Sequence, residues 1–258
     1  MTGTEISKNI INFLGTNLNN ISTSEFVDFV ISHAKIKKKI FITYLNAHCA
    51  NHYFKDKEYA DIIDKADVVY ADGMGIVYAS KYLGTPLKER VNAGDFFIDF
   101  CKRCEKEGLS LYFLGTKSRF LKRAKENIQE KVAGVKIVGT HDGYFSKEES
   151  NEIVDNINSL KPDILVIGMG IPYQEKWLSE NFEKLDVPIC WCVGALFDYF
   201  GGEFFRAPVL MRKLGLEWLF RLILEPRRMW KRYMIGNFTF INRVIEYKKE
   251  SIGRNNAK

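Results

Sequence analysis

The chain has 258 residues, 46% of them hydrophobic and 27% charged, which is enough for a large hydrophobic core and excludes a mainly disordered protein. The formal net charge of +6 comes entirely from residues 203–258, which hold 13 Lys and Arg against 5 Asp and Glu, whereas residues 1–202 hold 25 against 27. The five cysteines are an odd number without the dense spacing of a disulfide scaffold, so we expect a reducing compartment.

Targeting signals are not evident in the sequence. The N-terminal residues lack the basic start and the apolar run of a signal peptide, and no stretch of about 18 uninterrupted apolar residues predicts a membrane-spanning helix. We therefore expect a cytoplasmic protein without a transmembrane segment.

Strand and helix patterns alternate through residue 194. A capping box from Ser22 to Glu25 opens an amphipathic helix, and the β-branched and aromatic residues 40–45 predict a buried strand. Helices are predicted over 47–65 and 94–107, on either side of a short strand. Later strands alternate with further helices and are expected at 109–114, 135–140, 163–167 and 188–193. This order predicts an α/β fold with a largely parallel sheet.

The short strand runs directly into Asp72-Gly73-Met74-Gly75, and a helical pattern follows. Asp72 is therefore expected at the carboxyl end of a strand and just before a helix N-terminus, where open α/β sheets bind ligands and free amide groups attract anions. No neighbouring His, Ser or Cys in the sequence would serve a rival nucleophilic mechanism. Arg90 follows in the next polar loop, so this stretch supplies a candidate base and a candidate phosphate clamp.

Small or polar residues follow almost every predicted strand. A glycine after one strand is usually turn punctuation, but its recurrence favours a crevice that binds a nucleotide or a nucleotide sugar. The residues concerned are Thr43, Asn46, Asp72, Gly73, Gly115, Thr116, Gly168, Gly170 and Gly194.

Two common ligand-binding signatures are incomplete. Tyr173 stands where the dinucleotide fingerprint that starts at Gly168 would have its third glycine, which speaks against a hydride-transfer enzyme. The sequence has no Asp-x-Asp pair for a Mg²⁺-bridged diphosphate, so arginines and helix N-termini are expected to neutralise a leaving diphosphate. Cysteines such as Cys101 and Cys104 are expected to be buried thiols rather than metal ligands.

Beyond Arg206 only helical patterns occur, with cations interleaved among apolar and aromatic residues and a break at Pro226. A basic amphipathic segment of this kind can lie on an anionic bilayer, although nucleic-acid binding and a simple solvated face are alternatives. We expect an α/β catalytic domain over residues 1–202 and a basic, membrane-associating helical appendage over residues 203–258.

An ordered series of short motifs between Thr43 and Tyr233 resembles the WecG/TagA/CpsF family of bacterial glycosyltransferases. The series comprises Thr43-Tyr44-Leu45-Asn46, Ala71-Asp72-Gly73-Met74-Gly75, Glu89-Arg90-Val91, Leu114-Gly115-Thr116, Gly143-Tyr144-Phe145, Gly168-Met169-Gly170-Ile171-Pro172-Tyr173-Gln174-Glu175, Gly194-Ala195-Leu196-Phe197-Asp198, Arg206-Ala207-Pro208, Gly215-Leu216-Glu217-Trp218 and Glu225-Pro226-Arg227-Arg228. The resemblance implies a Rossmann-like α/β fold of the GT-E type. It also implies an inverting, metal-independent enzyme without a cofactor.

The implied reaction moves a sugar, typically of the N-acetylmannosamine type, from UDP to an undecaprenyl-diphosphate-linked sugar. It would take place on the cytoplasmic face of the membrane, in the synthesis of cell-surface polysaccharide or teichoic acid. The implied partners are therefore a UDP-sugar, the lipid-linked acceptor and an anionic membrane surface rather than a nucleic acid. Ala93 and Tyr173 depart from residues that are common in the family, so the donor sugar stays open.

The resemblance assigns roles to individual residues. Asp72 is the expected general base, Thr43 and Asn46 shape the sugar and acceptor pocket, and Arg90 and Gln174 hold donor or acceptor. The residues expected around the nucleotide are Gly115, Thr116, Glu175 and Asp198, with Gly194 as a further substrate-binding residue. The arginines expected to meet lipid head groups or the acceptor diphosphate are Arg206, Arg212, Arg221, Arg227, Arg228 and Arg232.

Two other functional classes stay open at this point. A nicotinamide-dependent oxidoreductase would use the Gly-rich strand ends for a dinucleotide, and a non-catalytic nucleic-acid-binding protein would use the basic C-terminal segment. Neither accounts for the ordered motif series. The sequence does not distinguish a monomer from a homo-oligomer, and it does not identify the acceptor or the polymer.

Overall fold

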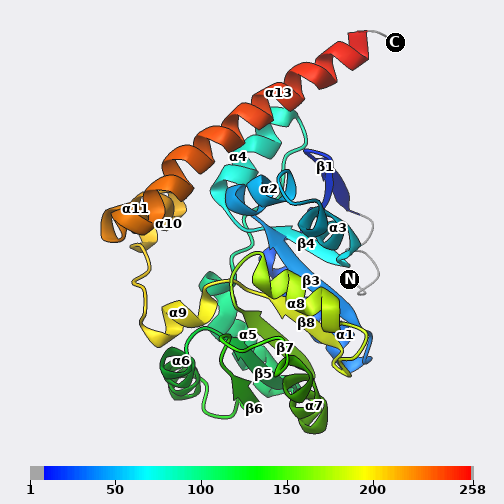
Figure 1. The fold of residues 1–258 in the computed structure, drawn as a ribbon, viewed down its shortest axis with the longest axis vertical. Helices are drawn as coiled ribbons and strands as arrows, with labels where there is room; N and C mark the ends of the chain where they lie inside the picture. The colour runs from blue at the N-terminus through cyan, green and yellow to red at the C-terminus, as the bar shows by residue number, and fades with distance from the viewer. Residues whose placement is uncertain (1–8, 257–258) are drawn as a thin grey trace.

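The computed structural model describes residues 9–256 and shows a six-stranded sheet between layers of helices (Figure 1). The strands lie in the order β4-β3-β8-β7-β5-β6, and every neighbouring pair is parallel. Their bounds are β3 Ile40–Leu45, β4 Val68–Ala71, β5 Ser110–Gly115, β6 Lys136–His141, β7 Ile164–Gly168 and β8 Ile189–Cys192. The predicted α/β fold with a largely parallel sheet is confirmed.

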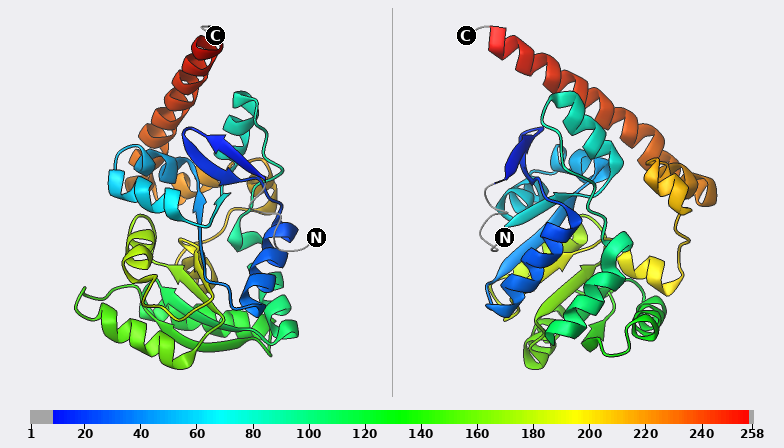
Figure 2. Two further views of the ribbon diagram at one scale, coloured as in Figure 1. Left: turned by 90° about the vertical axis from the view of Figure 1, so that its right-hand side faces the viewer. Right: turned by 180° about the vertical axis from the view of Figure 1, so that it is seen from behind.

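Helices bury both faces of this sheet (Figure 2). Because successive side chains of a strand point to opposite faces, Ile42 and Trp191 belong to one core, whereas their neighbours Phe41 and Cys190 belong to the other. The first core includes residues of α1 (Thr23–Lys35), α5 (Ala93–Glu107) and α6 (Ser118–Lys131), and the second includes residues of α3 (Lys57–Lys65), α7 (Ser150–Leu160) and α8 (Tyr173–Asn181).

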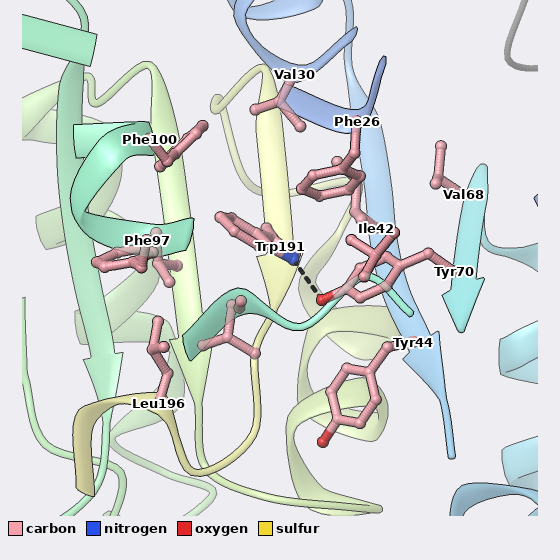
Figure 3. Close-up of a cluster of buried hydrophobic side chains, with 14 of the residues drawn as sticks. Phe26, Val30, Ile42, Tyr44, Val68, Tyr70, Phe97, Phe100, Trp191 and Leu196 are labelled. Atoms are coloured by element: carbon pink, nitrogen blue, oxygen red, sulfur yellow. Dashed lines mark hydrogen bonds between the residues drawn. The ribbon is translucent and has the colours of Figure 1, made fainter. Parts of the chain in front are cut away.

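Trp191 lies in the middle of the first core (Figure 3). Its ring centroid is 5.1 Å from that of Phe26 and 5.2 Å from that of Phe100, and all three side chains are buried. The indole Nε1–H donates to the Tyr70 hydroxyl at 3.1 Å. Since Tyr70 belongs to β4, this contact ties β8 to β4 across β3 and supports the strand end that carries Asp72.

One predicted helix differs from the structure, and one predicted helix cap is confirmed. The single helix predicted over residues 47–65 is wrong, because α2 (Ala47–Tyr53) ends and α3 begins again at Lys57. Asp56 caps α3 by accepting a hydrogen bond from the Tyr59 amide at 3.1 Å. The capping box predicted at Ser22 and Glu25 is present at the start of α1.

An unpredicted hairpin precedes α1. Its strands, β1 (Ile10–Phe13) and β2 (Thr16–Asn19), pair antiparallel around a two-residue turn. Leu14 and Gly15 both have positive φ, 53° and 93°, as a tight hairpin turn requires. The asparagines in both strands hide the hydrophobic alternation that would have predicted them.

Only helices follow α9 (Leu196–Gly201), as predicted for this part of the chain. In chain order they are α10 (Val209–Lys213), α11 (Glu217–Leu224), α12 (Pro226–Trp230), the π-helical segment η2 (Lys231–Ile235) and α13 (Gly236–Asn256). Helix α13 contacts α4 (Met74–Leu83). Helix α13 packs across α2 and α4 and buries Phe240 and Val244 (Figure 1). Within residues 9–256, no helix combines the length and the hydropathy needed to cross a bilayer.

Candidate active site

A large cleft separates the carboxyl ends of the strands from the C-terminal helices, with a volume of about 1740 Å³. This exceeds the roughly 300–1,000 Å³ of a typical small-molecule site, so the cleft has room for two substrates. The residues at or just after strand ends that line it include Asn46, Asp72, Thr116, Gly168, Gly170 and Gly194, and Asp198 of α9 lines it as well. The opposite wall includes Glu217, Trp218, Arg221, Arg228, Arg232 and Tyr233.

Asp72 is half-buried at the carboxyl end of β4, where its amide donates to the Leu45 carbonyl at 2.8 Å. Its Oδ1 accepts a hydrogen bond from Asn92 Nδ2 at 2.5 Å. Burial raises the pKa of Asp72 to about 6, although the hydrogen bond from Asn92 and the charge of Arg90 oppose the rise. A carboxylate with such a pKa is well matched to accept a proton near neutral pH.

Two residues after β3 reach the same cleft. Asn46 begins α2 by accepting hydrogen bonds from the amides of His48 and Cys49, at 2.9 and 3.0 Å. The His48 ring lines the cleft, and burial together with the charge of Arg232 lowers its pKa to about 3. His48 is therefore a neutral imidazole at pH 7. The sequence places His48 just after a strand, but it was not among the predicted site residues, because Arg232, which approaches it, comes from the far end of the chain.

Glycines allow close backbone contacts at the ends of β5, β7 and β8. A Cβ on Gly115, where φ is 147°, would stand 2.3 Å from the Gly168 carbonyl oxygen. A Cβ on Gly194 would stand 2.4 Å from the Tyr44 hydroxyl. A side chain at Gly115 would require a shift of the backbone, and one at Gly194 would require the Tyr44 side chain to move, so glycine is needed at both positions of the cleft floor.

Thr116 and Asp198 meet at the same edge of the sheet, where the Thr116 hydroxyl donates to Asp198. Burial raises the pKa of Asp198, and the hydrogen bond from Thr116 opposes that rise. Both side chains line the cleft at the end opposite Asp72, with the Gly194 turn between them and β3.

Three predicted substrate-binding residues lie beneath the cleft floor instead of lining it. Thr43, Gln174 and Glu175 are fully buried. Glu175 Oε1 accepts from Thr43 Oγ1 at 3.1 Å and from Gln174 Nε2 at 2.7 Å, and Gln174 Oε1 accepts from the Gly194 amide at 3.0 Å. Burial raises the pKa of Glu175 to about 7. The three side chains thus support the Gly194 turn from below.

Arg90, Arg206 and Arg212 form a cluster of ion pairs with Asp95 and Glu217, which we call the latch. Asp95 contacts all three guanidinium groups, at 3.0 Å in the case of Arg206. Glu217 lies 3.4 Å from Arg90 and 3.7 Å from Arg206. The latch therefore joins the loop before α5 to the C-terminal helices. The sequence did not reveal these ion pairs, because Asp95 is more than a hundred residues away from Arg206 and Arg212, and Glu217 is as far from Arg90.

Of the arginines predicted in the C-terminal segment, Arg221, Arg228 and Arg232 line the cleft, and Arg90 of the latch lines it as well. Arg221 is 8% exposed, its guanidinium lies 5.6 Å from the ring centroid of Tyr199, and its buried Nε has no hydrogen-bond partner among the described residues. The Nε of Arg232 is buried without a described partner as well. Such donors favour an anion in the cleft, because an unsatisfied buried donor costs about 1–3 kcal/mol. Arg227 is exposed and lies outside the lining.

Large hydrophobic side chains are exposed on the C-terminal helices, and Met234, Phe238, Ile241 and Ile245 among them line the cleft. Those on α10 to α13 and the segment before them are Phe205, Val209, Leu210, Leu214, Ile223, Leu224, Trp230, Met234, Ile235, Phe238, Ile241, Ile245 and Ile252. Such a concentration of exposed apolar groups marks an interaction surface.

The five cysteines are free and buried, as predicted. In the described part of the chain, no group of three or more His, Cys, Asp and Glu side chains is placed to hold a metal ion.

Three known proteins similar to this chain share the name N-acetylglucosaminyldiphosphoundecaprenol N-acetyl-beta-D-mannosaminyltransferase. The relative from Bacillus subtilis strain 168 is 30% identical over 217 residues, which cover 83% of each chain. That from Bacillus spizizenii strain W23 is 27% identical over 88% of this chain and 89% of its own. That from Staphylococcus aureus strain NCTC 8325 is 26% identical over 89% and 91%. The profile of the glycosyl transferase WecG/TagA/CpsF family matches residues 11–253, so the chain belongs to this family and is a glycosyltransferase.

Proposed function

We propose that the protein transfers an N-acetylmannosamine-type sugar from UDP to a GlcNAc residue that is linked through diphosphate to undecaprenol, with inversion and without a metal ion. The names of the relatives support the sugar and the acceptor. A cleft of about 1740 Å³ supports simultaneous binding of a donor and an acceptor head group. Family membership favours this class over the oxidoreductase and the nucleic-acid-binding protein.

The proposed reaction is a single displacement. The acceptor hydroxyl oxygen forms a bond to the anomeric carbon of the donor sugar, the bond from that carbon to the diphosphate oxygen breaks, and UDP leaves. Asp72 takes the proton of the hydroxyl through Oδ2, because Oδ1 is occupied by Asn92 and no described residue donates to Oδ2. General-base assistance of this kind contributes about 10²- to 10⁴-fold in rate.

The two ends of the cleft take different parts of the substrates in this proposal. Thr116 and Asp198 lie near the nucleotide, and the buried Thr43, Gln174 and Glu175 hold the Gly194 turn in place. Arg221, Arg228 and Arg232 face the acceptor diphosphate, since they lie close to the exposed apolar residues that a lipid would meet first. Charge-assisted contacts to a diphosphate would satisfy the buried Nε donors of Arg221 and Arg232.

Residues 203–258 act, in this proposal, as an appendage to a catalytic domain over residues 1–202, and they bind peripherally to the inner face of the membrane. Exposed apolar groups such as Leu210 and Ile223 would enter the interface, and exposed cations such as Arg227 would meet anionic head groups. This places the mouth of the cleft against the lipid surface that carries the acceptor.

The observation that supports this proposal best is that the half-buried carboxylate of Asp72 lines the same cleft as Arg221 and Arg232, whose buried Nε donors are unpaired among the described residues. The test measures UDP release from a panel of UDP-sugars, with and without a lipid-linked GlcNAc-diphosphate acceptor, in the presence of EDTA. We expect acceptor-dependent release with one N-acetylmannosamine-type donor. Release that requires a divalent cation would contradict the metal-independent mechanism, and absence of release with every donor would contradict the proposed reaction.

A further inference from the structure

Asn92 bridges the candidate base and the C-terminal segment. Its Nδ2 donates to Asp72 Oδ1 at 2.5 Å, and its Oδ1 accepts from Arg206 Nη2 at 3.2 Å. Sequence motifs drew attention to Asp72 and Arg206 but gave Asn92 no role beyond a polar turn. The two hydrogen bonds place one amide between residues that are 134 positions apart in the chain.

Arg206 fixes which way the Asn92 amide faces. A guanidinium group only donates hydrogen bonds, so it selects the carbonyl oxygen of the amide and leaves the NH₂ group for the carboxylate. If Arg206 were absent, the amide could turn its oxygen toward Asp72, where two oxygen atoms would repel each other. The orientation that suits the ionised base therefore depends on a residue outside the α/β sheet.

The position of Arg206 is itself well determined. Asp95 and Glu217 of the latch hold its guanidinium at 3.0 and 3.7 Å. Gly94 provides the space for this approach, because a Cβ there would stand 3.0 Å from Arg206 Cζ and Nη1. The same Cβ would stand 3.2 Å from Asn92 Oδ1, so a side chain at residue 94 would press on both partners of the Asn92–Arg206 hydrogen bond without removing any polar group.

We propose that Asn92 is a positioning residue for the base and that Arg206 sets its orientation, so that docking of the segment that carries Arg206 and Glu217 prepares Asp72 to accept a proton. This inference rests on the proposed function in one respect, the role of Asp72 as the base. It adds that Asp72 is prepared to accept a proton only while the ion pairs of the latch are formed.

Asp72 also faces other charged and titratable groups, all of which the proposed variants leave in place. They are Arg90 before α5, Asp95 in the first turn of α5, Glu217 of α11, Tyr44 of β3, Tyr70 of β4 and Cys49 of α2. Arg90 lowers the pKa of Asp72, whereas Asp95 and Glu217 raise it. Removal of Asn92 leaves these charges in place, whereas removal of Arg206 also takes an ion-pair partner from Asp95 and Glu217. The effect that passes through the amide is therefore isolated by comparing Arg206→Ala in the presence and in the absence of Asn92.

Asn92→Ala is expected to raise the pKa of Asp72 by about one to two pH units, because a hydrogen bond to a charged group is lost. The acid limb of the kcat profile should move to higher pH by the same amount. Turnover should fall about 2- to 10-fold at pH 7 and recover toward pH 9, a recovery that a general loss of structure would not show.

The coupling between the two residues can be measured with a double-mutant cycle. Arg206→Ala should raise the pKa of Asp72 in the same direction, and Asn92→Ala/Arg206→Ala should match Asn92→Ala alone, because Arg206 acts through the amide. Gly94→Ala, which keeps every polar group and suits the first turn of a helix, should reproduce part of the Arg206→Ala effect. Arg123→Ala removes a positive charge from the exposed face of α6 and is the matched control.

The deciding experiment titrates the Asp72 side-chain carboxyl by ¹³C NMR in the full-length protein labelled at aspartate, with Asp72→Asn to assign the signal. We expect a higher pKa in Asn92→Ala and in Arg206→Ala, no further rise in the double variant, and no change in Arg123→Ala. An unchanged pKa of Asp72 in Arg206→Ala, or additive rises in the double variant, would overturn the proposal that Arg206 acts on Asp72 through Asn92. Because this titration needs no turnover, it tests the action of Arg206 through Asn92 even if no sugar is transferred. Failure of sugar transfer by the wild type would count against the proposed function alone.

Discussion

Replacing the buried Glu175 by glutamine should change how the stability of the protein depends on pH. Burial raises the pKa of Glu175 from 4.5 to about 7, so the folded protein holds this proton more tightly than the unfolded chain does. The free energy of unfolding therefore falls as pH rises from about 4.5 through about 7, and the full loss is present above that range. The difference between the two pKa values corresponds to about 3 kcal/mol.

Urea unfolding at pH 4.5 and pH 8 measures this contribution. Relative to wild type, Glu175→Gln should gain about 3 kcal/mol of stability between the two pH values, because glutamine does not titrate. Any effect of the amide on packing is the same at both pH values and cancels from the comparison. Glu180→Gln, at an exposed carboxylate of the same helix, is the matched control. A stability difference that stays constant with pH in Glu175→Gln would refute the reasoning.

Three further predictions concern the cleft and the surface around it. Arg221→Met should raise KM for the lipid-diphosphate acceptor about tenfold or more in steady-state kinetics, with KM for the donor little changed, because one charge-assisted contact is lost. Gly115→Ala should destabilise the protein in urea unfolding, since the new Cβ would stand 2.3 Å from a backbone oxygen, whereas Gly253→Ala, with open space around it, should not. Ile223→Asp should weaken co-sedimentation with anionic vesicles, and Ile36→Asp, at an equally exposed residue that ends α1, should leave it unchanged. Equal effects within either matched pair, or a change confined to the donor KM, would contradict the corresponding assignment.

The sheet was predictable because each strand is a short apolar run and each connection has the period of a helix. Residues 40–45 and 164–168 are buried along their whole length, which is what a parallel strand covered on both faces requires. The single helix over residues 47–65 was wrong because its apolar spacing continues across the break. The only local signal for a new start was Asp56, and one capping residue does not outweigh a sustained periodicity.

The parts of the candidate site that depend on strand ends were predictable from the sequence. The parts that depend on contacts between side chains far apart in the sequence were not. Asp72 and Asn46 follow neighbouring strands, so their approach to one cleft follows from the parallel sheet. The arginines of the C-terminal segment look alike in the sequence, yet Arg206 pairs with Asp95 while Arg221 turns into the cleft. Which arginine pairs with a carboxylate and which one lines the cleft depends on how the C-terminal helices dock. Burial of Glu175 beneath the floor likewise depends on how α8 packs against the sheet.

The central claim is that Asp72 removes the proton of the acceptor hydroxyl, and Asp72→Asn tests it most directly because the amide keeps the shape and removes the base. The measurement is kcat for acceptor-dependent UDP release, together with the Kd of the donor by calorimetry, in wild type, Asp72→Asn and Asp99→Asn, where Asp99 is an exposed carboxylate of α5. The account predicts a loss of about 10²- to 10⁴-fold in kcat for Asp72→Asn alone, with the donor Kd little changed. Turnover by Asp72→Asn close to that of the wild type would contradict it.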